Sequence, residues 1–262
     1  DFPTDSESVD HAARRFRYVY DTYLRNAGTK TYLSVIPDKN TFIASQNGYP
    51  DKDYKALTER LRSGFPEAKY IDISGLLSAD DFYYTDSHWR QERITKVADE
   101  IAAQMGAERI GTCEMQDTGR PFYGVYYGQA ALPHAPERLF YLDNAVIRGL
   151  KVYNVETSSD IPVYDLGAAA GRDPYEMFLG GARSIIRITN PNAAQERRLI
   201  VFRDSFGSSI APLLAAGYSE ITLVDIRYIS PLSLGKLIDF TKADDALFLY
   251  SASVINNSET IK

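Results

Sequence analysis

The stretch RRLIVFRDSFGSSIAPLLAAGYSEITLVDI, residues 197–226, constrains the fold more than any other part of the chain. The apolar run RLIVF predicts a buried strand, the run after the polar turn RDS predicts a helix, and ITLVDI predicts a second strand. A strand, a crossover helix and a second strand form the unit of a parallel sheet. This segment therefore predicts an α/β fold.

The N-terminal half has the same rhythm. Helical spacing of apolar residues covers residues 5–28, 51–64 and 89–106, and β-prone runs cover residues 30–37 and 68–74. Residues 117–197 differ, because their β-prone runs are short and broken by Gly or Pro. We expect a single α/β domain over residues 1–262, with a β-rich insertion at 117–197. His88 is expected at or just before a helix start.

Composition excludes several classes of function. The net charge is −6 with a pI near 5.2, and no Lys/Arg cluster is long enough to bind a row of phosphates, so nucleic acid is not an expected partner. The longest apolar runs are too short to span a bilayer. The three histidines are scattered, Cys113 is the only cysteine, and no phosphate-binding glycine loop is present. We therefore expect no metal, no cofactor and no disulfide.

Two short stretches carry ionisable and nucleophilic groups. Ser205 follows the predicted strand RLIVF, at the carboxyl edge where open α/β sheets place their sites, and its own N–H is part of an oxyanion hole. A serine hydroxyl needs an adjacent base, and a histidine base needs a carboxylate to orient it. Asp86 and His88 in DSHW supply both groups, separated by one residue.

Simpler interpretations remain open at both places. Asp204 or Ser205 is equally suited to capping the helix that follows it, since Asp and Ser are preferred N-cap residues. Asp86 or Ser87 is likewise suited to capping a helix that begins near Trp89, which would leave His88 on the surface.

The motifs resemble those of a known family. TDSHW, after a tyrosine-rich loop, and RDSFGSSIAPLL resemble the bacterial proteins named after their Asp-His-His-Trp (DHHW) motif, which are similar to the SGNH-hydrolase-like proteins of alginate O-acetylation. VIPDKN, PFYGVYYGQA, YEMFLGG and VDIRY fit as well, so the likeness covers most of residues 30–255. Ser87 replaces the first histidine of the name, a position that the family's triad does not require.

The resemblance implies a flavodoxin-like, SGNH-hydrolase-like fold with circularly reordered blocks. Ser205 would attack an acyl ester, His88 would shuttle the proton, and Asp86 would orient the imidazole. The reaction implied is O-acetyl transfer to a polysaccharide, or its hydrolytic counterpart, with carbohydrate and envelope-assembly proteins as partners. We expect the protein to be secreted or membrane-anchored, with the signal or anchor absent from a sequence that begins at Asp1.

One departure concerns the oxyanion hole, which SGNH enzymes complete with a Gly and an Asn. Ala182 follows Gly181 in FLGG, so a side-chain donor is missing there or comes from elsewhere. Arg203 and Arg227 are candidate replacements, although Asp204 and Asp225 are available as their ion-pair partners. This departure motivates the alternative of a silent carbohydrate-binding or scaffold protein with the same fold.

The aromatic residues beside the motif have two interpretations. Trp89 and Tyr84 are candidates for stacking on a sugar ring, and the chain holds nineteen tyrosines. For Trp89, packing into the core below the motif is the simpler interpretation. The role of Tyr84 stays open.

Overall fold

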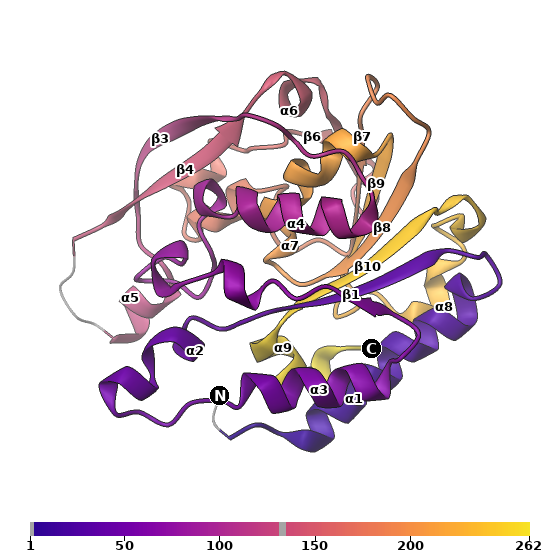
Figure 1. Ribbon diagram of the computed structural model, residues 1–262. Helices are drawn as coiled ribbons and strands as arrows, with labels where there is room; N and C mark the ends of the chain where they lie inside the picture. The colour runs from indigo at the N-terminus through magenta and orange to yellow at the C-terminus, as the bar shows by residue number, and fades with distance from the viewer. Residues whose placement is uncertain (1–2, 131–134) are drawn as a thin grey trace.

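The computed structural model describes residues 3–130 and 135–262, and it is an α/β fold built on one large sheet (Figure 1). This sheet has the order β2-β1-β10-β8-β9-β7-β5-β6. Its strands are, in that order, Lys69–Tyr70, Lys30–Ile36, Asp245–Ser251, Arg198–Arg203, Glu220–Val224, Ile185–Thr189, Lys151–Asn154 and Ser159–Ile161. The first five strands are parallel and the last three extend the sheet in antiparallel fashion. The predicted α/β class is confirmed.

A two-stranded antiparallel sheet lies beside the large one. It is formed by β3 (Glu114–Phe122) and β4 (Glu137–Asp143). The region 117–197 thus contributes strands to both sheets, since β5, β6 and β7 join the large sheet through β9. Its description as an insertion within a single domain stays a prediction.

Helices cover both faces of the large sheet. In Figure 1, α1 (Ser6–Val19), α3 (Tyr54–Gly64) and α9 (Ala252–Asn256) lie on one face, and α4 (Thr95–Met105) and α7 (Gly207–Ile210) lie on the other. The other α-helices of the described residues are α2 (Asn40–Ile43), α5 (Val125–Ala130), α6 (Ala145–Gly149) and α8 (Pro231–Leu234).

The two apolar cores follow from strand alternation. In β10, Leu247 and Leu249 enter the core under α4, whereas Phe248 and Tyr250 enter the core under α1 and α3. A strand buried on both faces reads as a continuous apolar run, which explains ALFLY.

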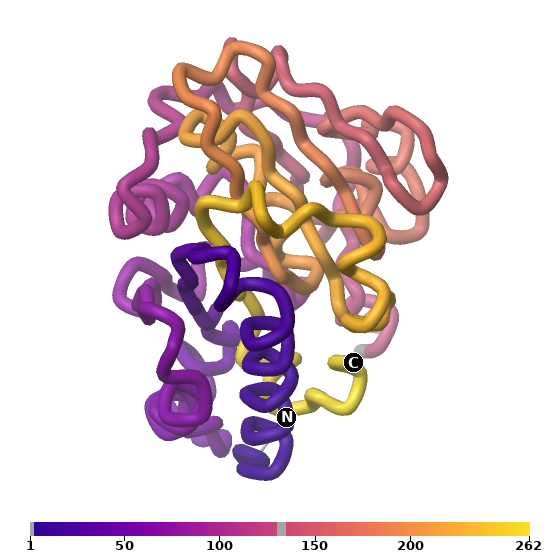
Figure 2. The backbone as a smooth tube through the Cα atoms, turned by 90° about the vertical axis from the view of Figure 1, so that its right-hand side faces the viewer, coloured from indigo at the N-terminus to yellow at the C-terminus, as the bar shows by residue number. Residues whose placement is uncertain are grey.

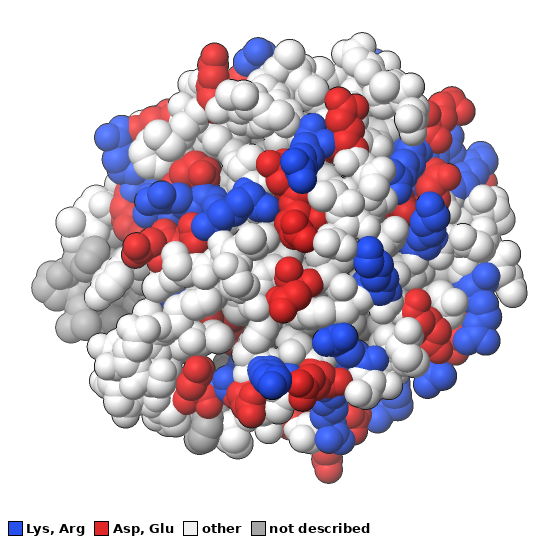
Figure 3. Space-filling view, in the orientation of Figure 1, with Lys and Arg blue, Asp and Glu red and all other residues white. Residues whose placement is uncertain are grey.

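The C-terminal segment packs against α1. The Ser8 hydroxyl donates to the Ile255 carbonyl at 2.9 Å, and Figure 2 shows the yellow C-terminal segment beside the indigo helix. On the face drawn in Figure 3, acidic and basic side chains are interspersed rather than gathered by sign. None of the helices within residues 3–130 and 135–262 combines the length and apolar character needed to cross a bilayer.

Two helices differ from the sequence-based prediction. Residues 89–94 are not α-helical, and α4 begins only at Thr95, because Trp89 forms an antiparallel bridge with Phe82 and the Arg90 N–H donates to the Asp81 carbonyl. The helix after Ser205 is α-helical only to Ile210 and continues as a 3₁₀ helix over Ala211–Gly217. Pro212 lacks the N–H that an α-helix would need there.

Three neighbouring parallel strands end at the same edge of the sheet. β1, β10 and β8 stop at Ile36, Ser251 and Arg203, and the register pairs Ile36 with Ser251 and Leu249 with Arg203. The segments that follow these strands are thereby brought together at the carboxyl edge. This is the edge where open α/β sheets bind ligands.

Candidate active site

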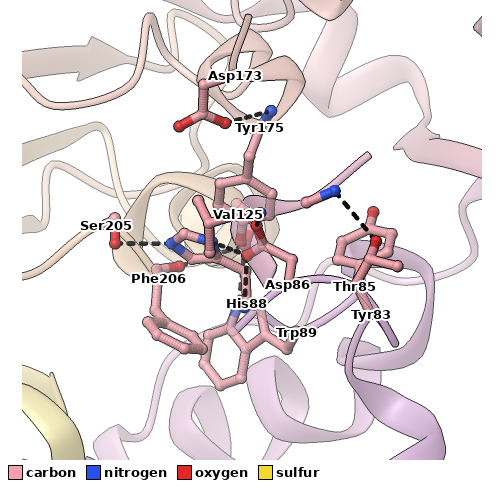
Figure 4. A network of polar contacts seen from close by, with 12 residues as sticks. Tyr83, Thr85, Asp86, His88, Trp89, Val125, Asp173, Tyr175, Ser205 and Phe206 are labelled. Carbon is pink, nitrogen blue, oxygen red and sulfur yellow. Dashed lines mark hydrogen bonds and ion pairs between the residues drawn. The ribbon is translucent and has the colours of Figure 1, made fainter. Parts of the chain in front are cut away.

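The side chains of Asp86, His88 and Ser205 form a continuous chain of contacts at this edge. His88 Nδ1 lies 2.6 Å from Asp86 Oδ1, and His88 Nε2 lies 2.7 Å from Ser205 Oγ. Figure 4 shows the imidazole between the serine and the carboxylate. Ser205 and His88 are 117 positions apart in the chain, so only the folded sheet edge brings them within hydrogen-bond reach.

The charge state of Asp86 fixes the tautomer of His88. Burial opposes ionisation of Asp86, but the His88 ring and the N–H groups of His88 and Val125 outweigh it and lower the pKa of this carboxyl below 3.8. An ionised carboxylate only accepts hydrogen bonds, so Nδ1 of His88 carries the proton. Nε2 is then free to accept the proton of the Ser205 hydroxyl.

Lys39, just after β1, holds the loop that carries Asp86. Its ammonium donates to the carbonyls of Tyr83, Tyr84 and Asp86 at 2.8, 3.0 and 3.1 Å. Burial lowers the pKa of Lys39, while the nearby charges of Glu137 and Asp86 act in the opposite direction. Three carbonyl oxygens around one ammonium fix the path of the loop.

The β3–β4 region holds the same loop from the other side. The Glu137 carboxylate accepts from the N–H groups of Tyr84 and Thr85, each at 2.8 Å. The Gly124 N–H donates to Thr85 Oγ1 at 3.1 Å, and the Val125 N–H donates to Asp86 Oδ2 at 2.9 Å. Thus the acid of the site is oriented by a segment outside the large sheet.

The turn after β8 presents Ser205 to the base. The Asp204 carboxylate is fully buried and accepts from the N–H groups of Phe206 and Ser251, at 3.1 and 2.8 Å. Asp204 therefore caps this turn, and the Ser205 hydroxyl faces His88 instead. The Ser205 N–H has no hydrogen-bond acceptor within the described residues.

Two adjoining hollows open at the site. A small pocket of about 180 Å³ contains Ser205 and His88 in its walls, together with segments that follow β1, β10 and β8. A larger groove of about 940 Å³ runs beside it and is lined by Tyr84, Tyr127, Phe82 and the arginines 90 and 93, among others. Lys39, Asn40 and Tyr126 line both hollows, so the two adjoin.

The remaining predicted site residues lie in different surroundings. Tyr84 is 70% exposed and lines the groove, whereas Trp89 is fully buried and donates from Nε1 to Ser209 Oγ at 2.8 Å. Arg227 binds both oxygens of Asp225, at 2.9 and 2.7 Å, and does not line either hollow.

The other two oxyanion candidates are also engaged away from the pocket. Arg203 is fully buried, and its Nη1 lies 3.9 Å from Asp225 Oδ2. The Gly181 N–H donates to the Phe178 carbonyl at 3.1 Å. Neither residue lines the pocket of Ser205. As donors to an oxyanion, Gly181, Arg203 and Arg227 stay predictions.

Sequence reasoning missed several residues that shape the site. Tyr175 stacks its ring on the His88 imidazole, with 3.9 Å between ring centres and 15° between planes. Ser209 receives hydrogen bonds from Tyr175 and Trp89. Lys39 lies within the quoted motif VIPDKN, but its partners are more than forty residues away in the chain. Among the described residues, no three His, Cys, Asp or Glu side chains cluster as metal ligands would.

The large, mostly parallel sheet with helices on both faces is an SGNH-hydrolase-like α/β fold. Solved structures share this fold. A DHHW family protein from Eubacterium siraeum has a TM-score of 0.74 and 17% identity, and covers 97% of this chain and 88% of its own. Bacillus cereus PatB1 with a sulfonyl adduct has a TM-score of 0.75 and 18% identity, and the match covers 96% of this chain and 90% of PatB1.

A third solved structure is more distant. The O-acetyltransferase domain of Pseudomonas putida AlgJ has a TM-score of 0.54 and 12% identity over 95% of this chain and 84% of that domain. No protein-family model and no curated protein matches the sequence. The resemblance inferred from the motifs is confirmed at the level of the fold.

Proposed function

We propose that the protein carries out serine acyl-ester chemistry, as an O-acetyltransferase or acetylesterase, on a polysaccharide outside the cytoplasm. The observation that carries the proposal is the continuous contact from Asp86 through His88 to Ser205 at the carboxyl edge of the sheet. The likeness to an O-acetyltransferase domain supports the same kind of reaction.

The mechanism follows from the proton positions. His88 Nε2 takes the Ser205 proton as Oγ attacks the acyl carbonyl, and the Ser205 N–H is available to the oxyanion that develops. His88 then gives the proton to the leaving alkoxide, which leaves an acyl group on Ser205. A sugar hydroxyl or water, deprotonated by His88, then attacks this acyl group. The acyl–Oγ bond breaks, and His88 returns the proton to Ser205 Oγ.

The groove supports a glycan as the second substrate. Exposed tyrosine rings beside polar groups suit the apolar faces and hydroxyls of sugars, and the groove adjoins the pocket of Ser205. Tyr84→Ala is expected to lower kcat/KM for a polysaccharide substrate while hydrolysis of a small ester is kept. Tyr49→Ala is the matched control, because Tyr49 is also 70% exposed but does not line the groove.

The first test uses a small activated acetyl ester and an aryl sulfonyl fluoride. Wild-type protein is expected to hydrolyse the ester and to gain the sulfonyl mass on Ser205, and a relative of this fold has been solved with such an adduct. Ser205→Ala and His88→Ala are expected to lose turnover by about 10³-fold or more. Equal turnover in wild type and both variants would contradict the triad.

The alternative is a glycan-binding or envelope scaffold protein without turnover. It is favoured by the engagement of Gly181 with Phe178 and of Arg203 and Arg227 with Asp225, since loss of one oxyanion donor costs about 10²–10³ in rate. Glycan binding that survives Ser205→Ala, without labelling or turnover in wild type, would establish this alternative.

A further inference from the structure

Ser209 lies below the site, and its hydroxyl has all of its hydrogen-bonding capacity in use. It accepts from the Tyr175 hydroxyl at 2.7 Å and from Trp89 Nε1 at 2.8 Å, and it donates to the Phe206 carbonyl at 3.2 Å. A serine hydroxyl has one donor and two acceptor positions. Because Ser209 is fully buried, removal of its oxygen leaves two buried donors without an acceptor.

The two residues that donate to Ser209, Tyr175 and Trp89, lie against and next to His88, the proposed base. The Tyr175 ring lies parallel to the His88 imidazole, as Figure 4 shows. Trp89 is the next residue after His88 and is fully buried. Ser209 itself belongs to α7, the short helix that begins two residues after Ser205. The Ser209 hydroxyl therefore connects Tyr175 and Trp89 to α7, the helix that follows Ser205.

We propose that Ser209 is a positioning residue that holds the His88 imidazole against Ser205. The inference rests on the proposed function, in which this imidazole is the base. No bond forms or breaks at Ser209, and it lines neither hollow. It acts by fixing Tyr175 and Trp89 relative to α7, so that the ring plane and the Nε2 direction are set before substrate binds.

The chain offers a matched control next to Ser209. Ser208 is also buried, but its hydroxyl has no hydrogen-bond partner within the described residues. Ser209→Ala and Ser208→Ala thus remove the same atom from adjacent positions of one helix. Only the first change breaks the connection to Tyr175 and Trp89.

The deciding measurement is the tautomer of His88, read by NMR of histidine-labelled protein. The chain has three histidines, and His88→Ala identifies the signal. In wild type and Ser208→Ala, the neutral form of the imidazole is expected to carry its proton on Nδ1 alone. Ser209→Ala is expected to show a second population, together with a fall in kcat of about ten- to a hundredfold at little change in KM.

Two outcomes separate this inference from the proposed function. If wild type has no turnover, the proposed function fails, and the tautomer comparison still decides the role of Ser209. If Ser209→Ala does not fold, Tyr175→Phe keeps the stacked ring and removes its hydroxyl, and a smaller shift in the same direction is expected. Tautomer populations and turnover equal to those of Ser208→Ala, in whichever of these variants folds, overturn the inference.

Discussion

A methyl group added at Gly124 would push the segment that carries Val125 away from Asp86, the acid of the site. A Cβ built on Gly124 would lie against the carbonyl oxygen of Thr85 and the Cβ of Asp86, and 2.5 Å from the Thr85 carbonyl carbon. These are backbone and near-backbone atoms, so no side-chain rotation relieves the overlap. Gly124→Ala must therefore displace the segment that carries Val125.

The size of the displacement follows from the contact distances. Ordinary contact begins at 3.4 Å, so the segment must retreat by about 0.9 Å from the Thr85 carbon. If Val125 moves equally, its N–H···Asp86 distance grows from 2.9 Å to about 3.8 Å, beyond hydrogen-bond reach. Loss of this charge-assisted bond and weakening of the Gly124 bond to Thr85 cost about 2–4 kcal/mol in the free energy of unfolding.

The assay is urea denaturation followed by the fluorescence of Trp89, the only tryptophan, together with ester turnover. Gly128→Ala is the control, because its Cβ would meet nothing within 4 Å and a helical Gly→Ala change stabilises by about 0.5–1 kcal/mol. Gly124→Ala is expected to lose stability and about tenfold or more in kcat. Stability and turnover equal to those of Gly128→Ala would refute the reasoning.

Three further expectations concern charged groups near the site. Lys39→Met should lower the unfolding free energy by roughly 2–4 kcal/mol and reduce turnover, because it removes three hydrogen bonds to the loop that carries Asp86. Lys55→Met is the control, because the Lys55 side chain is 84% exposed, and it should change neither quantity. Equal urea midpoints for the two variants would contradict this expectation. The folded pKa of Asp86 lies below 3.8, so its ionised form stabilises the fold above that pH and this stabilisation is lost as the pH falls through the folded pKa. The difference in unfolding free energy between wild type and Asp86→Asn should therefore narrow from about pH 6 to about pH 3, and a constant difference would argue against it. Arg203→Met should change unfolding free energy by less than about 1 kcal/mol, because the pair of Arg203 with Asp225 is long at 3.9 Å and Asp225 keeps its closer pair with Arg227. A loss above about 3 kcal/mol would show that the Arg203 pair is needed.

The sequence predicted those parts of the fold and site that depend on local patterns. The runs RLIVF and ALFLY became central strands because a strand buried on both faces must be apolar throughout. Ser205 could be singled out because it directly follows such a strand, and DSHW because its acid and base are separated by one residue.

The contacts that orient the site could not be predicted in the same way. The bonds from Lys39 to the loop at 83–86, from Thr85 to Glu137 and from Tyr175 to Ser209 join residues 34 to 52 positions apart, and no local pattern encodes them. The late start of α4 has the same origin, since the bridge between Phe82 and Trp89 overrides helical spacing.

The order of the strands in the large sheet has a consequence for synthesis on the ribosome. β1 is synthesised before its sheet neighbour β10, and Lys30 pairs with Asp245, which lies 215 positions further along the chain. Until β10 is made, β1 lacks this neighbour, and until the turn after β8 is made, Asp86 and His88 lack Ser205. Long-range pairing of this kind slows folding and leaves strand edges exposed in partly made chains. A nascent chain of this protein therefore gains β10 and Ser205 only long after β1, Asp86 and His88 have been made.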